Sequence, residues 1–283
     1  MERCRCVFAT DLHGQVDRYR KLASLVSEER PAVVLLGGDL LPPELRFGGD
    51  FIAEVLRPLF EEVRGASGVE GGTHVLLIPG NDDPAAQVEA LFDGEADGLW
   101  TVLHRRMVAV GGYRFAGYAC VPPTPFALKD WERYDVSRYV EPGCVAPHEG
   151  WRTVPVRPGE AVDRTIVEDL AMLAGGESLQ GTVFLFHAPP YGTVLDRAAL
   201  DGVVVDRVPV DVHVGSVAIA RFIEDRQPLV TLHGHIHESV RLTGAWRQRI
   251  GRTHLFGGAH DGPELACVRF DLADLDGARR DLM

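Results

Sequence analysis

Short apolar runs alternate with amphipathic helical patterns over the first hundred residues of this 283-residue chain. The alternation predicts strands at 4–10, 32–36 and 74–78, with helices at 15–29 and 51–63 between them. Strands that alternate with helices of this length are typical of a sheet with crossover helices. This pattern constrains the fold more than any other feature of the chain.

Glycine and polar residues follow each of these three strands. The segments are Asp11-Leu12-His13-Gly14, Gly37-Gly38-Asp39 and Pro79-Gly80-Asn81-Asp82. Two later strands, predicted at 182–186 and 229–232, end in the same way, at His187 and at His233-Gly234-His235-Ile236-His237. Because ligands bind at the carboxyl ends of the strands in such sheets, we expect a binding site where these segments meet.

The rest of the chain predicts mixed strand directions. Runs at 101–110 and 113–118 flank Gly111-Gly112, which indicates a hairpin. Helices are expected at 162–174 and 214–225, a loop at 188–212, and a β meander with runs at 239–242, 253–256 and 265–270. We therefore expect two mixed sheets packed face to face with helices outside, in a single domain over 1–283, since neither a repeat nor a Gly/Ser-rich linker divides it.

Residues 121–158 form an unusual segment, with seven of the 18 prolines and two of the four tryptophans. A long proline-rich segment without helical or strand periodicity is usually a functional loop, a lid or disordered. Its aromatic content favours an ordered insertion at the surface. The sequence leaves open whether this insertion is a packed cover, a substrate lid or a contact between copies of the chain in a homo-oligomer.

Composition excludes several classes of function. The charge of −12, from 29 basic and 41 acidic residues, disfavours long nucleic acids and anionic membranes as partners. No apolar stretch approaches the 18 residues of a membrane span, and the N-terminus does not resemble a signal peptide. Five cysteines without a Cys-x-x-Cys pair predict buried reduced thiols, with Cys4 and Cys6 in the core. We expect a cytoplasmic protein.

The polar residues at the strand ends include seven side chains that suit a metal site. They are Asp11, His13, Asp39, Asn81, His187, His235 and His237. Mixed imidazole and carboxylate ligation suits Mn, Fe, Zn, Co or Ni. Seven ligands are too many for one four-coordinate ion and fit two ions that share a carboxylate. Such two-ion sites clamp the attacking and leaving oxygens in phosphoester hydrolysis.

These residues occur in an order that resembles a known family. The pattern Asp11-x-His13, Gly38-Asp39, Gly80-Asn81, His187 and Gly234-His235-x-His237 resembles the calcineurin-like metallophosphoesterases, and spans 11–237. The segment from Pro189 to Thr193 is similar to bacterial and archaeal predicted phosphoesterases of that family. The resemblance implies an α/β fold, a four-layer α/β/β/α sandwich of two mixed sheets with outer helices.

The resemblance also implies a ligand set and a reaction. One ion would be held by Asp11, His13 and His237, the other by Asn81, His187 and His235, with Asp39 bridging the two. A hydroxide shared by both ions would attack phosphorus in a small phosphoester, with diesters slightly favoured over monoesters. Manganese is the preferred metal, ahead of iron, zinc, nickel and cobalt.

One position departs from the family pattern. Many relatives carry Gly-Asn-His, whose histidine assists the leaving group, and this chain has Asp82 there. His213 and His260 are the other candidates for the acid. The alternative to an enzyme is a non-catalytic binding or scaffold protein that retains the fold.

Two further residues lie within two positions of the ligand candidates in the sequence. His233 lies two residues before His235 and is a candidate to support the ligands. Asp83 lies directly before Pro84, where it would suit a helix N-cap.

Overall fold

The computed structural model describes residues 3–43, 49–66, 72–157, 159 and 163–283. Within these residues two six-stranded sheets lie face to face. The first has the order β14 (Asp274–Leu282), β13 (Ala266–Asp271), β1 (Arg5–Ala9), β2 (Val33–Gly37), β3 (His74–Ile78) and β4 (Thr101–Val102). The second has the order β11 (Arg247–Ile250), β12 (Thr253–Gly257), β10 (Val230–His233), β7 (Thr182–Phe186), β6 (Tyr113–Tyr118) and β5 (Arg106–Val110).

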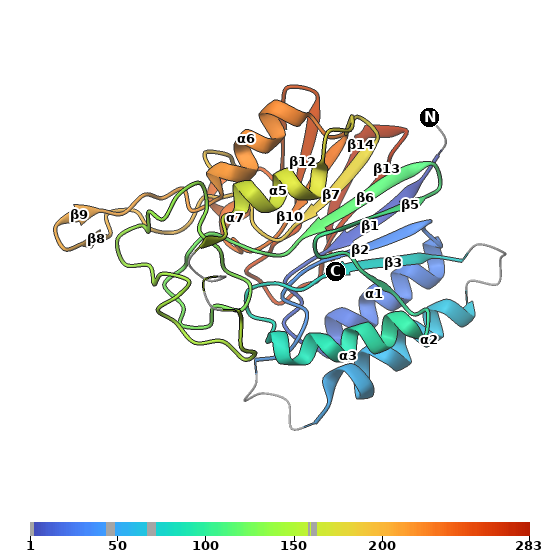
Figure 1. The fold of residues 1–283 in the computed structure, drawn as a ribbon. Helices are drawn as coiled ribbons and strands as arrows, with labels where there is room; N and C mark the ends of the chain where they lie inside the picture. Colours follow the sequence, from blue (N-terminus) through green and yellow to red (C-terminus); the bar gives the residue numbers. More distant parts are fainter. Residues whose placement is uncertain (1–2, 44–48, 67–71, 158, 160–162) are drawn as a thin grey trace.

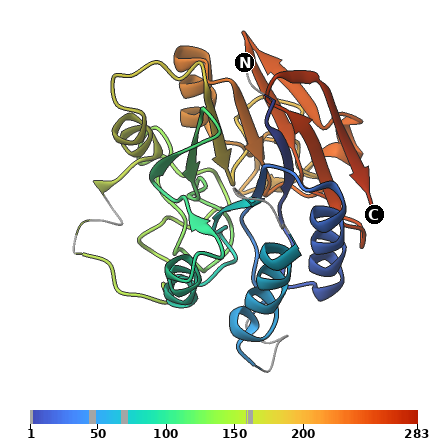
Figure 2. The same ribbon diagram turned by 90° about the vertical axis from the view of Figure 1, so that its right-hand side faces the viewer.

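Helices cover the outer faces of both sheets (Figures 1 and 2). On the first sheet lie α1 (Val16–Glu29), the π-helical turn Ile52–Leu56 that continues into α2 (Arg57–Ala66), and α3 (Ala85–Ala96). On the second lie α5 (Ile166–Ala174) and α6 (Val217–Arg226), with the short α7 (Ser239–Thr243) following β10. A small hairpin of β8 (Val204–Val205) and β9 (Val208–Pro209) projects from the same end as the insertion (Figure 1).

Strand alternation divides the apolar side chains among three cores and so produces four layers. In β1, Val7 and Ala9 pack toward the helices of the first sheet, whereas Cys6 and Phe8 pack between the sheets. Likewise Phe184 and Phe186 of β7 pack against α5 and α6 in the third core. The expected four-layer α/β/β/α sandwich is confirmed, and Cys4 and Cys6 lie in the core as free thiols.

Parallel pairing brings the carboxyl ends of the central strands to one edge. Strands β1, β2 and β3 are parallel in the first sheet, and β6, β7, β10 and β12 are parallel in the second. Strands β13, β14, β5 and β11 add antiparallel pairs, so both sheets are mixed. The five polar strand ends noted in the sequence therefore lie together.

Some expectations about the elements are wrong. The run 101–110 is divided between the sheets, as β4 and β5, with Arg105 in the left-handed region (φ 57°) at the change. Residues 239–242 belong to helix α7, which Gly244 ends with a φ of 71°. The predicted meander is absent from the described residues, since β12 joins the second sheet and β13 joins the first.

The helix expected at 162–174 begins at Ile166, and position 162 lies outside the described residues. For helix α3 the sequence predicts only a start, at the N-cap position before Pro84, and gives no extent. Its apolar pattern is weak, because Val88, Leu91 and Gly94 are its buried positions among alanines and acidic residues.

The insertion is ordered without regular structure. Its described part, 121–157, contains turns and isolated bridges in place of helices and strands. A fully buried ion pair between Lys129 and Glu132 (2.6 Å) lies inside it. Asp135 accepts hydrogen bonds from Ser216 Oγ and the Val217 amide, which fixes the insertion to the start of α6. The end of the predicted segment at 158 lies outside the described residues.

None of the helices in the described ranges has the length and apolar character needed to cross a membrane.

Candidate metal centre

The loops that follow β1, β2 and β10 adopt a backbone conformation that side chains seldom take. Asp11, His13, Asp39 and His235 have φ values of 56°, 47°, 52° and 71°. Left-handed conformations at residues with a side chain cost roughly 1–3 kcal/mol each and concentrate at functional sites. Hydrogen bonds from the Asp11 amide to Gly38 O (2.9 Å) and from the His13 amide to Asp39 O (2.7 Å) hold the first two loops side by side.

Glycines beside the ligand candidates leave room for them. A Cβ atom on Gly38 would lie 2.6 Å from His187 Nδ1, and one on Gly80 would collide with Asp39 Oδ1. A Cβ on Gly234 would lie 2.8 Å from Asp11 Oδ2. The glycines of these motifs are therefore required by the close approach of the loops.

Four of the candidate ligands form one cluster. Asp11, His13, Asp39 and His237 each offer one ligand atom, and all these atoms lie within 4.8 Å of one another. His13 Nε2 and His237 Nε2 are 3.2 Å apart, and His237 Nε2 is 3.4 Å from Asp11 Oδ1. Two imidazole nitrogens and two carboxylates converging on one point is a donor set suited to a transition metal.

A second cluster shares Asp39 with the first. Asp39, His187 and His235 also place their ligand atoms within 4.8 Å of one another. His187 Nε2 lies 3.3 Å from Asp39 Oδ2 and 3.0 Å from Asn81 Oδ1, which brings the amide oxygen into the group. All seven residues predicted from the strand ends thus meet at one place, with Asp39 between the two clusters.

The donor set fits a pair of divalent cations. Asp11 Oδ2 is buried and lacks a hydrogen-bond partner among the described residues. Such an oxygen is costly unless a cation or donor meets it. His187 Nδ1 bonds to Gly37 O (2.8 Å), which leaves Nε2 directed at Asp39 and Asn81.

Burial and neighbouring charges both shift the pKa values of these groups. Burial alone would raise the pKa of Asp11, but the hydrogen bond from His237 and the neighbouring histidines hold that pKa well below its usual range. Burial would lower the pKa of His187, whereas the charge of Asp39 raises it to about 10. Burial, together with the charge of His187, lowers the pKa of His235 to about 3. The carboxylates of Asp11 and Asp39 and the imidazole of His187 thus stabilise one another's charged forms.

The three candidates for the acid lie in different surroundings. Asp82 lies beside the ligands: its Oδ1 accepts from Asn81 Nδ2 (2.8 Å), and its Oδ2 is 3.8 Å from His13 Nδ1. Burial and the charge of Asp39 raise the pKa of Asp82, whose side chain is 48% exposed. His213 Nδ1 instead pairs with Asp196 Oδ1 (2.8 Å), and His260 Nε2 pairs with Glu264 Oε2 (2.9 Å).

His233 uses neither ring nitrogen on a ligand side chain. Its Nδ1 bonds to the carbonyl oxygen of Ala188 (2.9 Å), the residue after His187, and its Nε2 bonds to Thr231 Oγ1 (2.8 Å). Burial lowers the pKa of His233 to about 4, which makes it a neutral core residue.

Asp83 is also not the N-cap of α3. The N-cap residue is Pro84, and the Ala85 amide donates to Asp130 Oδ2 (2.8 Å) of the insertion. The Asp83 carboxylate instead turns inward to the backbone of the metal loops. An acidic residue before proline gave the N-cap prediction, and the sequence contains no signal for this inward contact.

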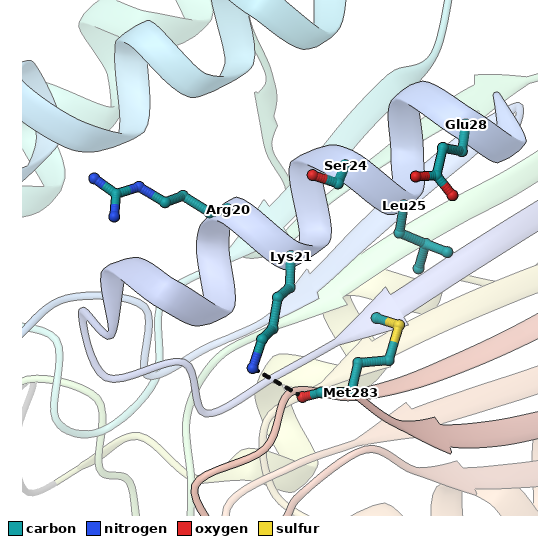
Figure 3. A pocket seen from close by; sticks show the side chains of 6 residues that line it. All are labelled: Arg20, Lys21, Ser24, Leu25, Glu28 and Met283. Atoms are coloured by element: carbon teal, nitrogen blue, oxygen red, sulfur yellow. Dashed lines mark hydrogen bonds between the residues drawn. The ribbon is translucent and has the colours of Figure 1, made fainter.

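A hollow of about 340 Å³ on the surface of α1 is separate from this site. Figure 3 shows its lining, in which Lys21 Nζ donates to Met283 O at 3.2 Å. It is lined by residues of α1 and Met283 and includes none of the ligand candidates.

Comparisons with known proteins identify the family. The family model for calcineurin-like phosphoesterases matches residues 4–239. The chain belongs to the calcineurin-like phosphoesterase family. The match covers all seven ligand candidates, and it confirms the family resemblance drawn from the strand-end motifs.

Individual relatives of this calcineurin-like phosphoesterase are distant. An uncharacterized protein of Methanocaldococcus jannaschii is 26% identical over 239 residues, which cover 83% of this chain and 81% of the relative. A crystal structure of TT1561 of Thermus thermophilus is 17% identical, covers 99% of both chains and has a TM-score of 0.59. Another crystal structure is 18% identical, covers 100% of this chain and 99% of its own, and has a TM-score of 0.60. These structures share the fold.

Proposed function

We propose that this phosphoesterase hydrolyses its substrate with the help of two divalent metal ions. Manganese is the metal that we expect both sites to prefer. Asp11, His13 and His237 would hold one ion, and Asn81, His187 and His235 would hold the other. Asp39 would bridge them. The observation that carries the proposal is the membership of Asp39 in both clusters of ligand atoms.

The ions and the residues of the chain would make different contributions to the reaction. When bound, the ions would supply Lewis acidity toward the phosphoryl oxygens and lower the pKa of water, so that hydrolysis proceeds near neutral pH. The left-handed turns at Asp11, His13, Asp39 and His235 fix the ligand atoms before binding, which lowers the reorganisation that the reaction requires. Asp82 is the candidate for leaving-group assistance that the geometry favours, because it lies beside Asn81 and His13.

The substrate class follows from charge. Asp82 adds a half-exposed carboxylate at the ligand set, where many relatives have a histidine. In its ionised form that carboxylate repels the dianion of a phosphomonoester more strongly than the monoanion of a diester, whereas only its protonated form can donate to a leaving group. We therefore propose a small phosphodiester as the preferred substrate. The net charge of −12 makes a long nucleic acid an unfavourable partner.

We also propose a domain organisation for this chain and a compartment in which it acts. We propose that 1–283 act as one domain that carries 121–158 as an insertion, because the two faces of β1 contribute to different cores of the same sandwich. The five free cysteines, four of them buried, support a reducing compartment such as the cytoplasm.

A hydrolysis assay with two substrates tests the proposal. The protein, freed of metal and reloaded with Mn²⁺, is given bis-p-nitrophenyl phosphate and, separately, p-nitrophenyl phosphate. We expect turnover of both, faster for the diester, and loss of both after chelation with EDTA. Turnover of neither substrate with Mn²⁺, Fe²⁺, Zn²⁺, Ni²⁺ or Co²⁺ would contradict an enzyme and favour the scaffold alternative. Faster monoester turnover would contradict the diester preference alone.

A further inference from the structure

The carboxylate of Asp83 is fully buried and bonds to backbone amides of two metal loops. Its Oδ1 accepts from the Leu41 amide (2.8 Å), and its Oδ2 accepts from the amides of Leu40 (3.0 Å) and Gly80 (2.8 Å). A buried carboxylate costs much free energy unless it is fully hydrogen-bonded, and charge-assisted bonds of this kind are stronger than neutral ones.

The three bonds end on the immediate neighbours of two ligand candidates. Leu40 and Leu41 follow Asp39, and Gly80 precedes Asn81. In the opposite direction, the Asp82 amide in the loop after β3 donates a hydrogen bond to Asp39 Oδ1 in the loop after β2 (2.8 Å). The loops after β2 and β3 are therefore joined in both directions, by the Asp83 carboxylate on one side and by the Asp39 carboxylate on the other.

The insertion contacts the opposite side of the same residue. Trp131 Nε1 donates to the carbonyl oxygen of Asp83 (2.7 Å), and Asp130 Oδ2 accepts from the Ala85 amide (2.8 Å). Thr153 Oγ1 accepts from the Ala86 amide (2.9 Å). Segment 83–86 is thus held between the metal loops and the insertion.

We propose that Asp83 is a positioning residue that sets the distance between Asp39 and Asn81. It acts through the backbone of both loops and does not touch the ions. Its carboxylate keeps Asp39 in its left-handed conformation (φ 52°), because the two amides that follow Asp39 are bonded to it. This inference rests on the proposed two-ion centre.

The test compares Asp83→Asn with Asp135→Asn. In the Asp83→Asn variant an NH₂ group must face at least one backbone amide, so at least one bond is lost and two donors oppose each other. Asp135 is a matched control, since its carboxylate also accepts from three donors, the Ser216 hydroxyl and two backbone amides at the start of α6, and none of these donors belongs to the loops after β2 and β3. Mn²⁺ affinity is measured by isothermal titration calorimetry, and thermal unfolding is measured on the metal-free proteins.

We expect both variants to unfold at lower temperature, and Asp83→Asn alone to lose Mn²⁺ affinity, by tenfold or more. Asp135→Asn should bind within twofold of the wild type. A merely structural role predicts that the two variants lose stability and keep the same affinity, and that result would overturn the proposal. If the wild type binds no Mn²⁺, the proposed function fails; if it binds and Asp83→Asn binds equally well, only the role of Asp83 fails.

A second variant covers the case in which Asp83→Asn does not fold. Trp131→Phe removes the donor to the Asp83 carbonyl, and so loosens the segment that positions the Asp83 carboxylate without altering the carboxylate itself. We expect a two- to fivefold loss of Mn²⁺ affinity in this variant. Unchanged affinity in Trp131→Phe, with Asp83→Asn unfolded, would also overturn the proposal.

Discussion

The metal loops and the insertion are ordered by different means. The ligand candidates lie within four residues of the ends of β1, β2, β3, β7 and β10, and each of these strands is buried where it ends. The described insertion, 121–157, has no strand or helix. Asp130 and Asp135 bond to backbone and hydroxyl groups outside it, and Glu132 bonds to the Thr124 amide within it. The sheets therefore place the metal loops, whereas individual polar contacts place the insertion.

From this difference we predict how a substitution in each region should affect activity and stability. A change in a metal loop alters ligand geometry that two sheets have fixed, so activity should fall more than stability. A change inside the insertion that leaves its bonds to segment 83–86 intact removes one of the contacts that order it, so stability should fall while the ligands stay in place. The three predictions below test that division.

The largest effect is expected for Asp39→Asn. Asp39 shares ligand atoms with both clusters, and an amide supplies one neutral oxygen where a bridging carboxylate supplies two anionic ones. We expect turnover of bis-p-nitrophenyl phosphate with Mn²⁺ to fall by about 10³-fold or more. Activity within tenfold of the wild type would show that Asp39 does not bridge.

An intermediate effect is expected for Gly80→Ala. The added Cβ would collide with Asp39 Oδ1, and a displacement of a reacting group by about 1 Å can cost about 10²-fold in rate. The matched control is Gly65→Ala in α2, where a Cβ meets nothing within 4 Å. We expect the control to keep full activity in the same assay, and equal activity of the two variants would refute the close approach of the loops.

The smallest effect on activity, with a clear effect on stability, is expected for Lys129→Met. This substitution leaves Glu132 buried without its cation, which costs about 3–5 kcal/mol in comparable buried pairs. Urea unfolding measures the loss of stability, and Mn²⁺ affinity of the folded variant should match that of the wild type.

Arg138→Met is the matched control for Lys129→Met. It removes an exposed ion pair with Asp163 in which the two side chains are 64% and 67% exposed, so it should cost about 0.5 kcal/mol or less. If both variants lose the same stability, the buried pair is not what orders the insertion.

The same division explains what the sequence predicts well. The ligand candidates follow strands, and strand ends can be predicted from apolar runs, so Asp11, Asp39 and His187 are found without a structure. The four-layer sandwich follows in the same way from strand alternation and family resemblance. Contacts that depend on tertiary structure are not found, as the inward carboxylate of Asp83 and the ring bonds of His233 show.

Local patterns also mislead where tertiary pairing decides the outcome. The run 101–110 has uniform strand character, yet its two parts pair with different sheets. Residues 239–242 contain valine and leucine in a pattern typical of a strand, but they follow a metal loop and form one helical turn. Neither outcome has a signal within the segment itself.

The central claim is that Asp39 joins two metal sites into one centre, and the stoichiometry of Mn²⁺ binding tests it most directly. Calorimetric titration of the metal-free wild type and of Asp39→Asn gives the number of ions and the affinity of each step. We predict two Mn²⁺ per chain for the wild type, and weaker binding of both ions together in Asp39→Asn. A wild type that binds one ion or none, or a variant that loses one ion and keeps the other at full affinity, would contradict the account.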